Sequence, residues 1–285
     1  MHYTKKYDKI LKVNIYSLYQ FQNKKYIPLI NKKVNFFLNE VYSILLPRKD
    51  VLKPMIYVTG DTHGIASRFD DPRLRKLKRG DTLIVCGDFG FLWDGSKEEM
   101  NTLKKLSKKK YNICFVDGTH ENFEMLSSMK IKKWNGGKVH HIATNIFHLM
   151  RGQIFTIEDT KVFTMGGGES PDIDIRFEMD TWSDMEIPTR EELIEGVDNL
   201  QKYDGKVDII ITHEPPAKIK DFLLLDTGSD ASITAINTYL EDVSRICTFK
   251  HWYFGSLHLD KFISTTHIGV FHNIINAKTG EPLRR

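Results

Sequence analysis

The sequence predicts an α/β fold, and three features of its pattern lead to this prediction. Short apolar runs recur after Pro54, and each ends in a small cluster of glycine, aspartate and histidine. Polar stretches of helical character separate several of these runs, which favours parallel pairing of strands in at least part of a sheet. Between residues 139 and 165 the apolar runs follow one another with only turns between them, which is typical of antiparallel strands.

Four segments are predicted to be buried strands that deliver polar residues at their carboxyl ends. They are MIYVTGDTHG (55–64), DTLIVCGDFG (81–90), YNICFVDGTHEN (111–122) and VDIIITHEPP (207–216). The clearest helical stretches among the polar segments are 97–109, 189–203 and 230–245. Strands and helices therefore alternate along much of the chain.

Two groups of antiparallel strands are predicted in addition. The first contains VHHIATNIFHLM, GQIFTIED and KVFTMGGG, within residues 139–168. The second closes the chain with FKHWYFGSLHLD, FISTTHIGV and FHNIINAKTGE, from residue 249 to residue 281. We expect antiparallel pairing within each group because only short turns connect its members.

The first 54 residues differ from the rest in charge. They contain eleven Lys and Arg against three Asp and Glu, a net of +8, so residues 55–285 carry −4 of the chain's total of +4. Phe37, Val41 and Leu45 recur at helical spacing, and Pro47 follows as a stop signal. We predict a basic, Lys/Tyr-rich helical extension over 1–54 ahead of a domain over 55–285; contact with nucleic acid or an anionic membrane is the alternative role for the extension.

Composition excludes several classes of protein. A hydrophobic share of 41% and a charged share of 27% are ordinary for a globular protein, and no apolar run is long enough for a transmembrane helix. The lysine-rich start lacks the apolar core of a signal peptide, so a cytoplasmic location is expected. Cys86, Cys114 and Cys247 form no C-x-x-C pair, which predicts reduced, buried cysteines rather than a metal cluster.

Residues of the type that bind metals follow five of the predicted strands. Ligands in open α/β sheets gather beyond the carboxyl ends of the strands, where the loops converge. Carboxylate oxygen and imidazole nitrogen together suit zinc, manganese or iron, and two such ions can activate water against a phosphate ester. The residues concerned are Asp61 and His63, Asp88, His120, His213, and His258.

Five motifs in order, GDTHG, GDFG, GTHEN, THEPP and GSLH, resemble the motif set of the calcineurin-like metallophosphoesterases: G-D-x-H, G-D, G-N-H-[DE], H and G-H-x-H. The resemblance spans about residues 55–275. It implies that family's fold, a two-sheet β-sandwich of mixed strands flanked by helices, with a dinuclear metal centre at the strand ends. It also implies hydrolysis of phosphomonoesters or phosphodiesters by metal-activated hydroxide.

Carried onto this chain, the resemblance makes Asp61, His63 and His258 ligands of the first metal and Asp88 the bridge between two metals. His213 would bind the second metal. The family's histidine that matches His120 is not a ligand, and it assists the leaving oxygen as general acid or charge stabiliser. The glycines before these residues permit tight turns that aim side chains into one site: Gly60, Gly87, Gly118 and Gly255.

Two positions depart from the family pattern, and both would serve the second metal. Thr119 stands where the family has its asparagine ligand, and Ser256 stands where it has the first histidine of G-H-x-H. Neutral hydroxyls are poor replacements for an amide oxygen and an imidazole. We therefore predict one firmly bound divalent transition metal (Mn, Fe or Zn) rather than two. That Thr119 and Ser256 are ordinary turn residues without a metal role remains the alternative to weak or water-mediated ligation.

The segment FTMGGGESPDIDIRFEMDTW (163–182) adds a softer signal. Glycine amides together with Arg176 could cradle a phosphate, which makes Arg176 a candidate substrate-binding residue; a mobile loop is the alternative. Glu121 either orients the His120 imidazole or begins the next helix, where an acidic residue suits the helix dipole.

Two functions of different classes follow. The first is a metal-dependent phosphatase or phosphodiesterase in which Asp88 holds the metal centre and His120 helps the leaving group. The second is a degenerate phosphoesterase-fold protein that binds a phosphorylated ligand or a partner without efficient turnover, for which Thr119 and Ser256 are the grounds. A nuclease-like role has only the basic extension as additional support.

Overall fold

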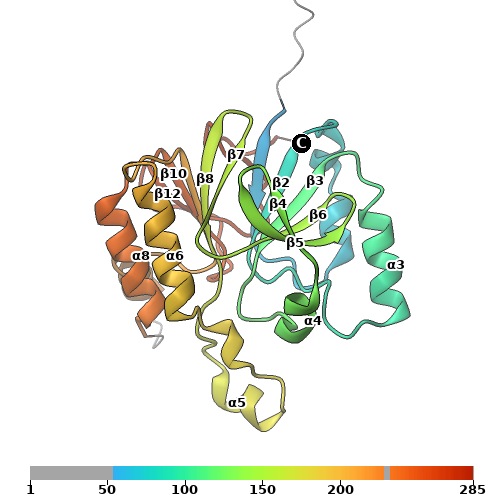
Figure 1. Cartoon of the computed structure of the whole chain (residues 1–285), viewed down its shortest axis with the longest axis horizontal. Coiled ribbons are helices and arrows are strands. Elements are labelled where there is room, and N and C mark those ends of the chain that lie inside the picture. Colours follow the sequence, from blue (N-terminus) through green and yellow to red (C-terminus); the bar gives the residue numbers. More distant parts are fainter. Residues whose placement is uncertain (1–53, 228–231, 285) are drawn as a thin grey trace, which may run out of the picture. The chain divides into compact units, whose positions relative to one another are not determined.

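The computed structural model describes residues 54–227 and 232–284, so the extension predicted over 1–54 lies outside the described residues except for Pro54. The described part contains two mixed β-sheets packed face to face, with helices covering their outer faces (Figure 1). The predicted α/β fold with a two-sheet sandwich flanked by helices is confirmed.

The first sheet has seven strands in the order β13-β1-β2-β3-β6-β5-β4. Its centre, β1, β2, β3 and β6, is parallel, and the remaining strands are antiparallel to their neighbours. The strands are β1 (Ile56–Thr59), β2 (Thr82–Cys86), β3 (Asn112–Val116), β4 (Ile131–Trp134), β5 (Gly137–Ala143), β6 (Ile146–Leu149) and β13 (Ile275–Asn276).

The second sheet has six strands in the order β11-β12-β10-β9-β8-β7. Here β8, β9, β10 and β12 are parallel, while β7 and β11 pair antiparallel at the two edges. The strands are β7 (Gln153–Ile157), β8 (Thr160–Met165), β9 (Ile209–Thr212), β10 (His251–Phe254), β11 (Lys261–Phe262) and β12 (His267–Gly269).

Strand alternation divides the buried side chains into three layers of core. In β9, Ile209 and Ile211 face the other sheet, whereas Ile210 faces the helices outside. In β2, Ile84 likewise faces inward and Leu83 outward. Because successive strand residues point to opposite faces and both faces are covered, these strands are apolar throughout.

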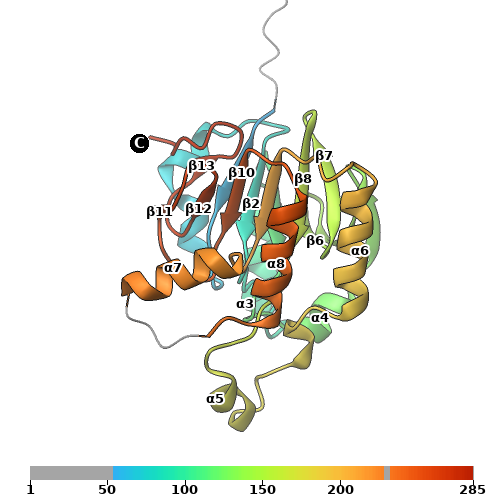
Figure 2. The same cartoon turned by 90° about the vertical axis from the view of Figure 1, so that its left-hand side faces the viewer.

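The helices have recognisable start signals in the sequence. Ser96 caps the helix that follows it, Thr189 and Glu192 form a capping box, and Thr234 pairs in the same way with Asn237. α6 and α8 lie over the outer face of the six-stranded sheet, with α7 nearby (Figure 2). The α-helices are α3 (Lys97–Leu106), α4 (Phe123–Ser128), α5 (Ile173–Glu178), α6 (Arg190–Gln201), α7 (Ala217–Thr227) and α8 (Ala235–Ile246), and the 3₁₀ helices are η1 (Ala66–Asp70), η2 (Pro72–Lys76) and η3 (Asp184–Glu186).

The prediction that an antiparallel group ends the chain is wrong for its main strand. β10 runs parallel to both β9 and β12, whereas β11 pairs antiparallel with β12, and β13 pairs antiparallel with β1. The reason is that α7 and α8 form a crossover from β9 to β10, which returns the chain in the same direction. In the earlier group, β7 and β8 are antiparallel as predicted. VHHIATNIFHLM, expected to pair with GQIFTIED, instead folds back on itself as the antiparallel pair β5–β6 in the other sheet.

The three cysteines are free and buried, as predicted. Cys86 and Cys114 pack between the sheets, and Cys247 packs under the helices of the second sheet. Among the described residues, none of the helices has the length and apolar character needed to span a bilayer.

A buried charge cluster lies directly after β3. The Asp117 carboxylate, 1% exposed, accepts hydrogen bonds from Arg151 at 2.8 and 2.6 Å and lies 2.9 Å from His148 Nε2. Arg151 also donates to the carbonyl oxygen of Met185 and to Glu192, both beyond β8. Burial alone would raise the pKa of Asp117, but Arg151 and His148 hold it well below its usual range. The cluster therefore ties the end of β3 to β6 of the same sheet and to the segment of η3 and α6 that follows β8.

Replacing Asp117 with Asn should lower the free energy of unfolding by about 3–5 kcal/mol, because Arg151 would remain buried without its counter-charge. Chemical denaturation measures this change. Lys138→Met is the matched control, since it breaks the exposed pair between Lys138 and Glu195 and should cost about 1 kcal/mol or less. Similar losses for the two variants would contradict the role assigned to Asp117.

The stabilities of the wild type and of Asp117→Asn should depend differently on pH. A carboxyl whose folded pKa is depressed stabilises the fold fully above its unfolded pKa of about 3.9 and loses that contribution as the pH falls toward the folded value. The stability gap between wild type and Asp117→Asn should therefore narrow as the pH is lowered from about 6 to about 3. A gap that stays constant over this range would show that the Asp117 charge is not the cause.

Candidate metal centre

The carboxyl ends of parallel strands from both sheets meet at one edge of the sandwich. The loops after β1 and β2 supply residues from the first sheet, and the loop after β10 supplies one from the second. One ligand atom from each of four residues lies within 4.8 Å of the others. The residues are Asp61, His63, Asp88 and His258. We call this set the ligand cluster.

Asp61 of the ligand cluster has a buried carboxylate without hydrogen-bond donors: neither of its oxygens has a hydrogen-bond partner among the described residues. Nε2 of His258 lies 3.1 Å from Oδ2, and Nδ1 of His213 lies 3.8 Å from Oδ1. Burying a carboxylate without donors is costly, and a bound cation would remove that cost. The orphaned carboxylate therefore fits a metal ligand.

The two histidines of the ligand cluster point their ring nitrogens at one another. Nε2 of His63 lies 2.9 Å from Nε2 of His258, and it lies 3.8 Å from Oδ2 of Asp88. Four donors, two carboxylates and two imidazoles, thus converge on one point from separate loops. Such a donor set suits a divalent transition metal rather than calcium or magnesium, which prefer oxygen ligands alone.

Three members of the ligand cluster adopt a backbone conformation that L-residues rarely use. His63, Asp88 and His258 have φ angles of 44°, 42° and 48°, in the left-handed region. Each such residue costs on the order of 1–3 kcal/mol and persists only where its surroundings enforce it. Here the Asp88 carbonyl oxygen accepts hydrogen bonds from the backbone N–H groups of Thr62 and His63, at 3.0 and 2.8 Å. The fold holds these residues in strained positions that bring their side chains together.

Glycines in the motifs make room for these side chains. A Cβ on Gly118 would lie 2.0 Å from Oδ1 of Asp88, and a Cβ on Gly255 would lie 2.1 Å from Oδ1 of Asp61. The expected reason, tight turning, is therefore incomplete, because close approach of a ligand side chain to the backbone also requires glycine here.

His120 is held by two contacts to Asp88 and one to Thr119. Its backbone N–H donates to Asp88 Oδ1 at 2.8 Å, its Nδ1 lies 3.1 Å from Asp88 Oδ2, and Nδ1 also lies 3.0 Å from the Thr119 hydroxyl. The hydrogen bond with Asp88 raises the pKa of His120 against the opposing effect of burial. Nε2 faces Asp172 Oδ2 at 3.7 Å and lies outside the ligand cluster. This leaves Nε2 as the ring atom available to a bound molecule.

A comparison with protein families matches residues 54–268 to calcineurin-like phosphoesterases. The chain belongs to the calcineurin-like phosphoesterase family. This confirms the resemblance drawn from the five motifs, and it supports a metal-dependent hydrolase of phosphate esters in general. A search of curated proteins found no significant match to the chain.

At the positions where the family binds its second metal, this phosphoesterase has His213, Thr119 and Ser256, which are not part of the ligand cluster. His213 is buried, with Nε2 4.0 Å from Asp88 Oδ1 and Nδ1 3.8 Å from Asp61 Oδ1. Burial would lower the pKa of His213, but Asp88 and Asp61 raise it to about 9. Thr119 directs its hydroxyl to His120, and the buried Ser256 hydroxyl has no hydrogen-bond partner among the described residues. That these positions hold no firmly bound second ion stays a prediction.

Arg176, the candidate phosphate contact, lies near His120 but points into its own loop. It is 5% exposed, and its guanidinium is bound to Glu186 at 2.8 Å, to the Ser170 hydroxyl and to the Thr181 carbonyl oxygen at 3.0 Å. Glu186 is itself fully buried. This environment favours a structural role for Arg176 in the loop after β8, and phosphate binding by Arg176 stays a prediction.

Neither role suggested for Glu121 is observed. Its buried carboxylate accepts hydrogen bonds from the backbone N–H groups of Phe89 at 2.7 Å and Gly90 at 3.3 Å. α4 begins only at Phe123, with Asn122 as its cap. Glu121 therefore secures the loop after β2, directly behind Asp88, and only the three-dimensional pairing of β2 with β3 reveals this.

Adding Mn²⁺ should raise the thermal unfolding midpoint by roughly 5–10 °C at a concentration about a hundredfold above the dissociation constant, because an ion that binds only the folded state stabilises it. Asp61→Asn should abolish most of this shift, since it removes the charge of the orphaned carboxylate. His141→Ala, which removes a histidine of β5 outside the ligand cluster, is the control and should keep the full shift. An undiminished shift in Asp61→Asn would contradict the assignment.

Proposed function

We propose that this protein hydrolyses phosphate esters with one firmly held divalent transition metal at Asp61, His63, Asp88 and His258, and with His120 assisting the leaving oxygen. The observation that carries the proposal is the convergence of these four donors within 4.8 Å, beside an imidazole that takes no part in the cluster. Manganese, iron and zinc all suit the donor set.

When bound, such an ion supplies a Lewis acid for the phosphoryl oxygens and lowers the pKa of a water that can attack phosphorus. The chain's own residues supply the rest. Asp61 and Asp88 provide the negative charge that retains the cation, and the strained backbone at His63 and His258 presents their nitrogens without further rearrangement. Asp88 and Thr119 fix the His120 ring through Nδ1, and Nε2, which lies 3.7 Å from Asp172 Oδ2, is the ring atom that would donate a proton to the departing alkoxide.

The second-metal site is proposed to be weak. Asp88 and His213 remain at the family's ligand positions, but Thr119 is engaged with His120 and Ser256 offers only a hydroxyl. Loss of two ligands removes most of the affinity for a second ion, so the clamp on the attacking and leaving oxygens is incomplete. Whether the substrate is a monoester or a diester is decided by assay of both.

A second candidate function rests on the same two substitutions. If Thr119 and Ser256 abolish turnover, the protein is a binding module in which the retained metal anchors a phosphorylated ligand or a partner. Turnover of a chromogenic phosphomonoester or phosphodiester by the manganese-loaded protein separates the two. Nucleic-acid binding through residues 1–54 is a further prediction outside the described residues.

The purified protein should contain close to one transition-metal ion per chain by elemental analysis. Thr119→Asn combined with Ser256→His should raise both metal content and turnover far more than either change alone, because the ligands of one ion act as a unit. Thr119→Val combined with Ser256→Ala is the control and should leave the content near one. Two tightly held ions in the wild type, or loss of metal from the control, would show that the hydroxyls already serve a second ion.

His120→Ala should lower kcat by roughly 10²-fold or more, with esters of acidic alcohols affected least, because help from a general acid matters most for a basic leaving oxygen. Metal content should stay close to that of the wild type. Asp88→Ala, in contrast, should lose both metal and activity. Loss of metal from His120→Ala would mean that His120 is itself a ligand, and its role as acid would have to be withdrawn.

A further inference from the structure

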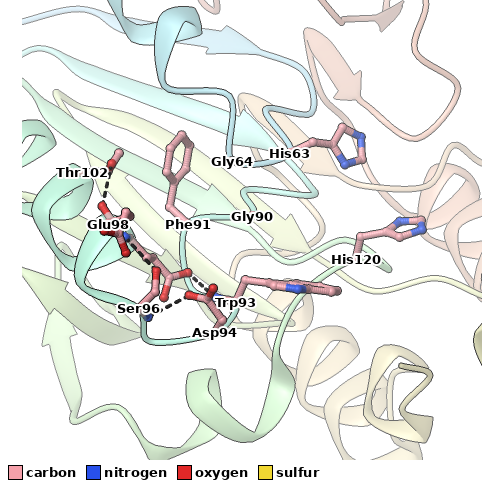
Figure 3. A pocket seen from close by; sticks show the side chains of 11 residues that line it. His63, Gly64, Gly90, Phe91, Trp93, Asp94, Ser96, Glu98, Thr102 and His120 are labelled. Carbon is pink, nitrogen blue, oxygen red and sulfur yellow. Dashed lines mark hydrogen bonds between the residues drawn. The ribbon is translucent and has the colours of Figure 1, made fainter. Parts of the chain in front are cut away.

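A cavity of about 510 Å³ adjoins the ligand cluster on the side of His63 and His120 (Figure 3). Beyond these two histidines, its wall is built from the loop after β2 and from the first residues of α3. The side chains that give this wall its chemistry are Trp93, Asp94, Ser96, Glu98, Glu99 and Thr102. The reaction proposed above uses none of them.

The loop that carries Trp93 is held by its backbone. Glu99 accepts hydrogen bonds from the N–H groups of Trp93 and Gly95, the latter at 2.7 Å. Asn122 donates from Nδ2 to the Trp93 carbonyl oxygen at 2.6 Å. Ser96 then caps α3 by accepting from the Glu99 N–H at 3.1 Å. The position of the Trp93 backbone is thus set by Glu99 of α3 and by Asn122, the cap residue of α4.

Trp93 is more exposed than the two residues before it in the loop. It is 43% exposed, whereas Phe91 and Leu92 in the same loop are buried. In Figure 3 the indole extends toward the same side of the cavity as the imidazoles of His63 and His120. An exposed indole on a fixed loop beside the reacting centre offers a flat apolar surface on which a planar group can stack at low entropic cost.

The charge of the cavity wall has one sign. Three carboxylates line it, and its lining includes no Lys or Arg among the described residues. Asp94 and Glu98 are exposed and form no ion pair within the described part of the chain, whereas Glu99 is occupied with the loop backbone. A wall of this kind repels a second anionic group and attracts a cation, and a cation also gains from contact with an indole face.

We propose that this cavity binds the alcohol part of the phosphate ester, and that this part is a planar group carrying a positive charge. The proposal rests on the proposed function, because it places the phosphoryl group at the ligand cluster and the leaving group beside His120. Trp93 stacks on the planar group, and Asp94 with Glu98 selects for its charge.

The test compares aryl phosphates that share a ring and differ in charge: 4-(aminomethyl)phenyl phosphate, phenyl phosphate and 4-carboxyphenyl phosphate, with ethyl phosphate as the ester without a ring. Comparing each variant with wild type on the same ester cancels the intrinsic reactivity of the ester. Trp93→Ala should lower kcat/KM for the aryl esters by roughly tenfold, as expected for loss of a stacking surface, with a smaller loss for ethyl phosphate.

Asp94→Asn combined with Glu98→Gln should lower kcat/KM for the aminomethyl ester and raise it for the carboxy ester, so that their ratio changes by roughly tenfold or more. Phe262→Ala, which removes an aromatic ring exposed on β11, is the matched control and should change none of these values. Equal changes for all esters, or no change, in both cavity variants would overturn the proposal. Trp93→Phe keeps a ring, so it should retain most of the wild-type kcat/KM for the aryl esters. This result would exclude misfolding as the cause of the loss in Trp93→Ala.

A binding measurement separates failure of the cavity from failure of the proposed function. The alcohol 4-(aminomethyl)phenol is titrated into the metal-loaded full chain and followed by shifts in its NMR signals. Binding to wild type that is lost in Trp93→Ala supports the cavity even if no ester is hydrolysed. Hydrolysis without this binding, and without discrimination among the aryl esters, overturns the cavity proposal and leaves the phosphoesterase intact.

Discussion

Hydrogen bonds to one residue, Asp88, join the parts of the centre, and the rest of the arrangement depends on them. Asp88 follows β2; its carbonyl oxygen accepts the backbone N–H groups of Thr62 and His63 after β1, and its side chain accepts the N–H of His120 after β3. Gly118 leaves the space in which the Asp88 side chain lies. Because three strand ends meet on this buried residue, loss of the Asp88 side chain removes a proposed ligand and the support of His120 together, whereas its carbonyl oxygen would still hold the loop after β1.

The centre stores strain that the rest of the fold has to offset. His63, Asp88 and His258 are held in left-handed conformations, and the Asp61 carboxylate is buried without a hydrogen-bond donor in the described structure. Three layers of apolar core and the buried cluster around Asp117 supply the opposing stability. Strain of this kind concentrates at functional sites because it fixes side chains in position before a ligand arrives. Trp93 is also held by its backbone, without a strained φ angle, and its side chain is partly exposed.

The sequence alone predicts the residues whose position follows from strand ends. Asp61, His63 and Asp88 could be grouped because parallel strands deliver their carboxyl ends to one edge. His258 could be added only through its GSLH motif, because the predicted direction of the strand before it is wrong. Roles that depend on a partner distant in sequence could not be predicted. Glu121 holds the backbone after β2, Arg176 pairs with Glu186, and β10 is parallel because a helical crossover precedes it. The Trp93 cavity could not be predicted for the same reason, since its wall and the two histidines beside it come from different strand ends.

The central claim, that four residues form one strong metal site beside a weakened one, is tested most directly by anomalous X-ray diffraction at the manganese edge. Crystals of the full chain grown with Mn²⁺ should show one strong peak within coordinating distance of Asp61, His63, Asp88 and His258. A peak of equal strength between Asp88, His213 and Ser256 would contradict the weakened second site. A strong peak elsewhere, with none at the ligand cluster, would contradict the account of the centre itself.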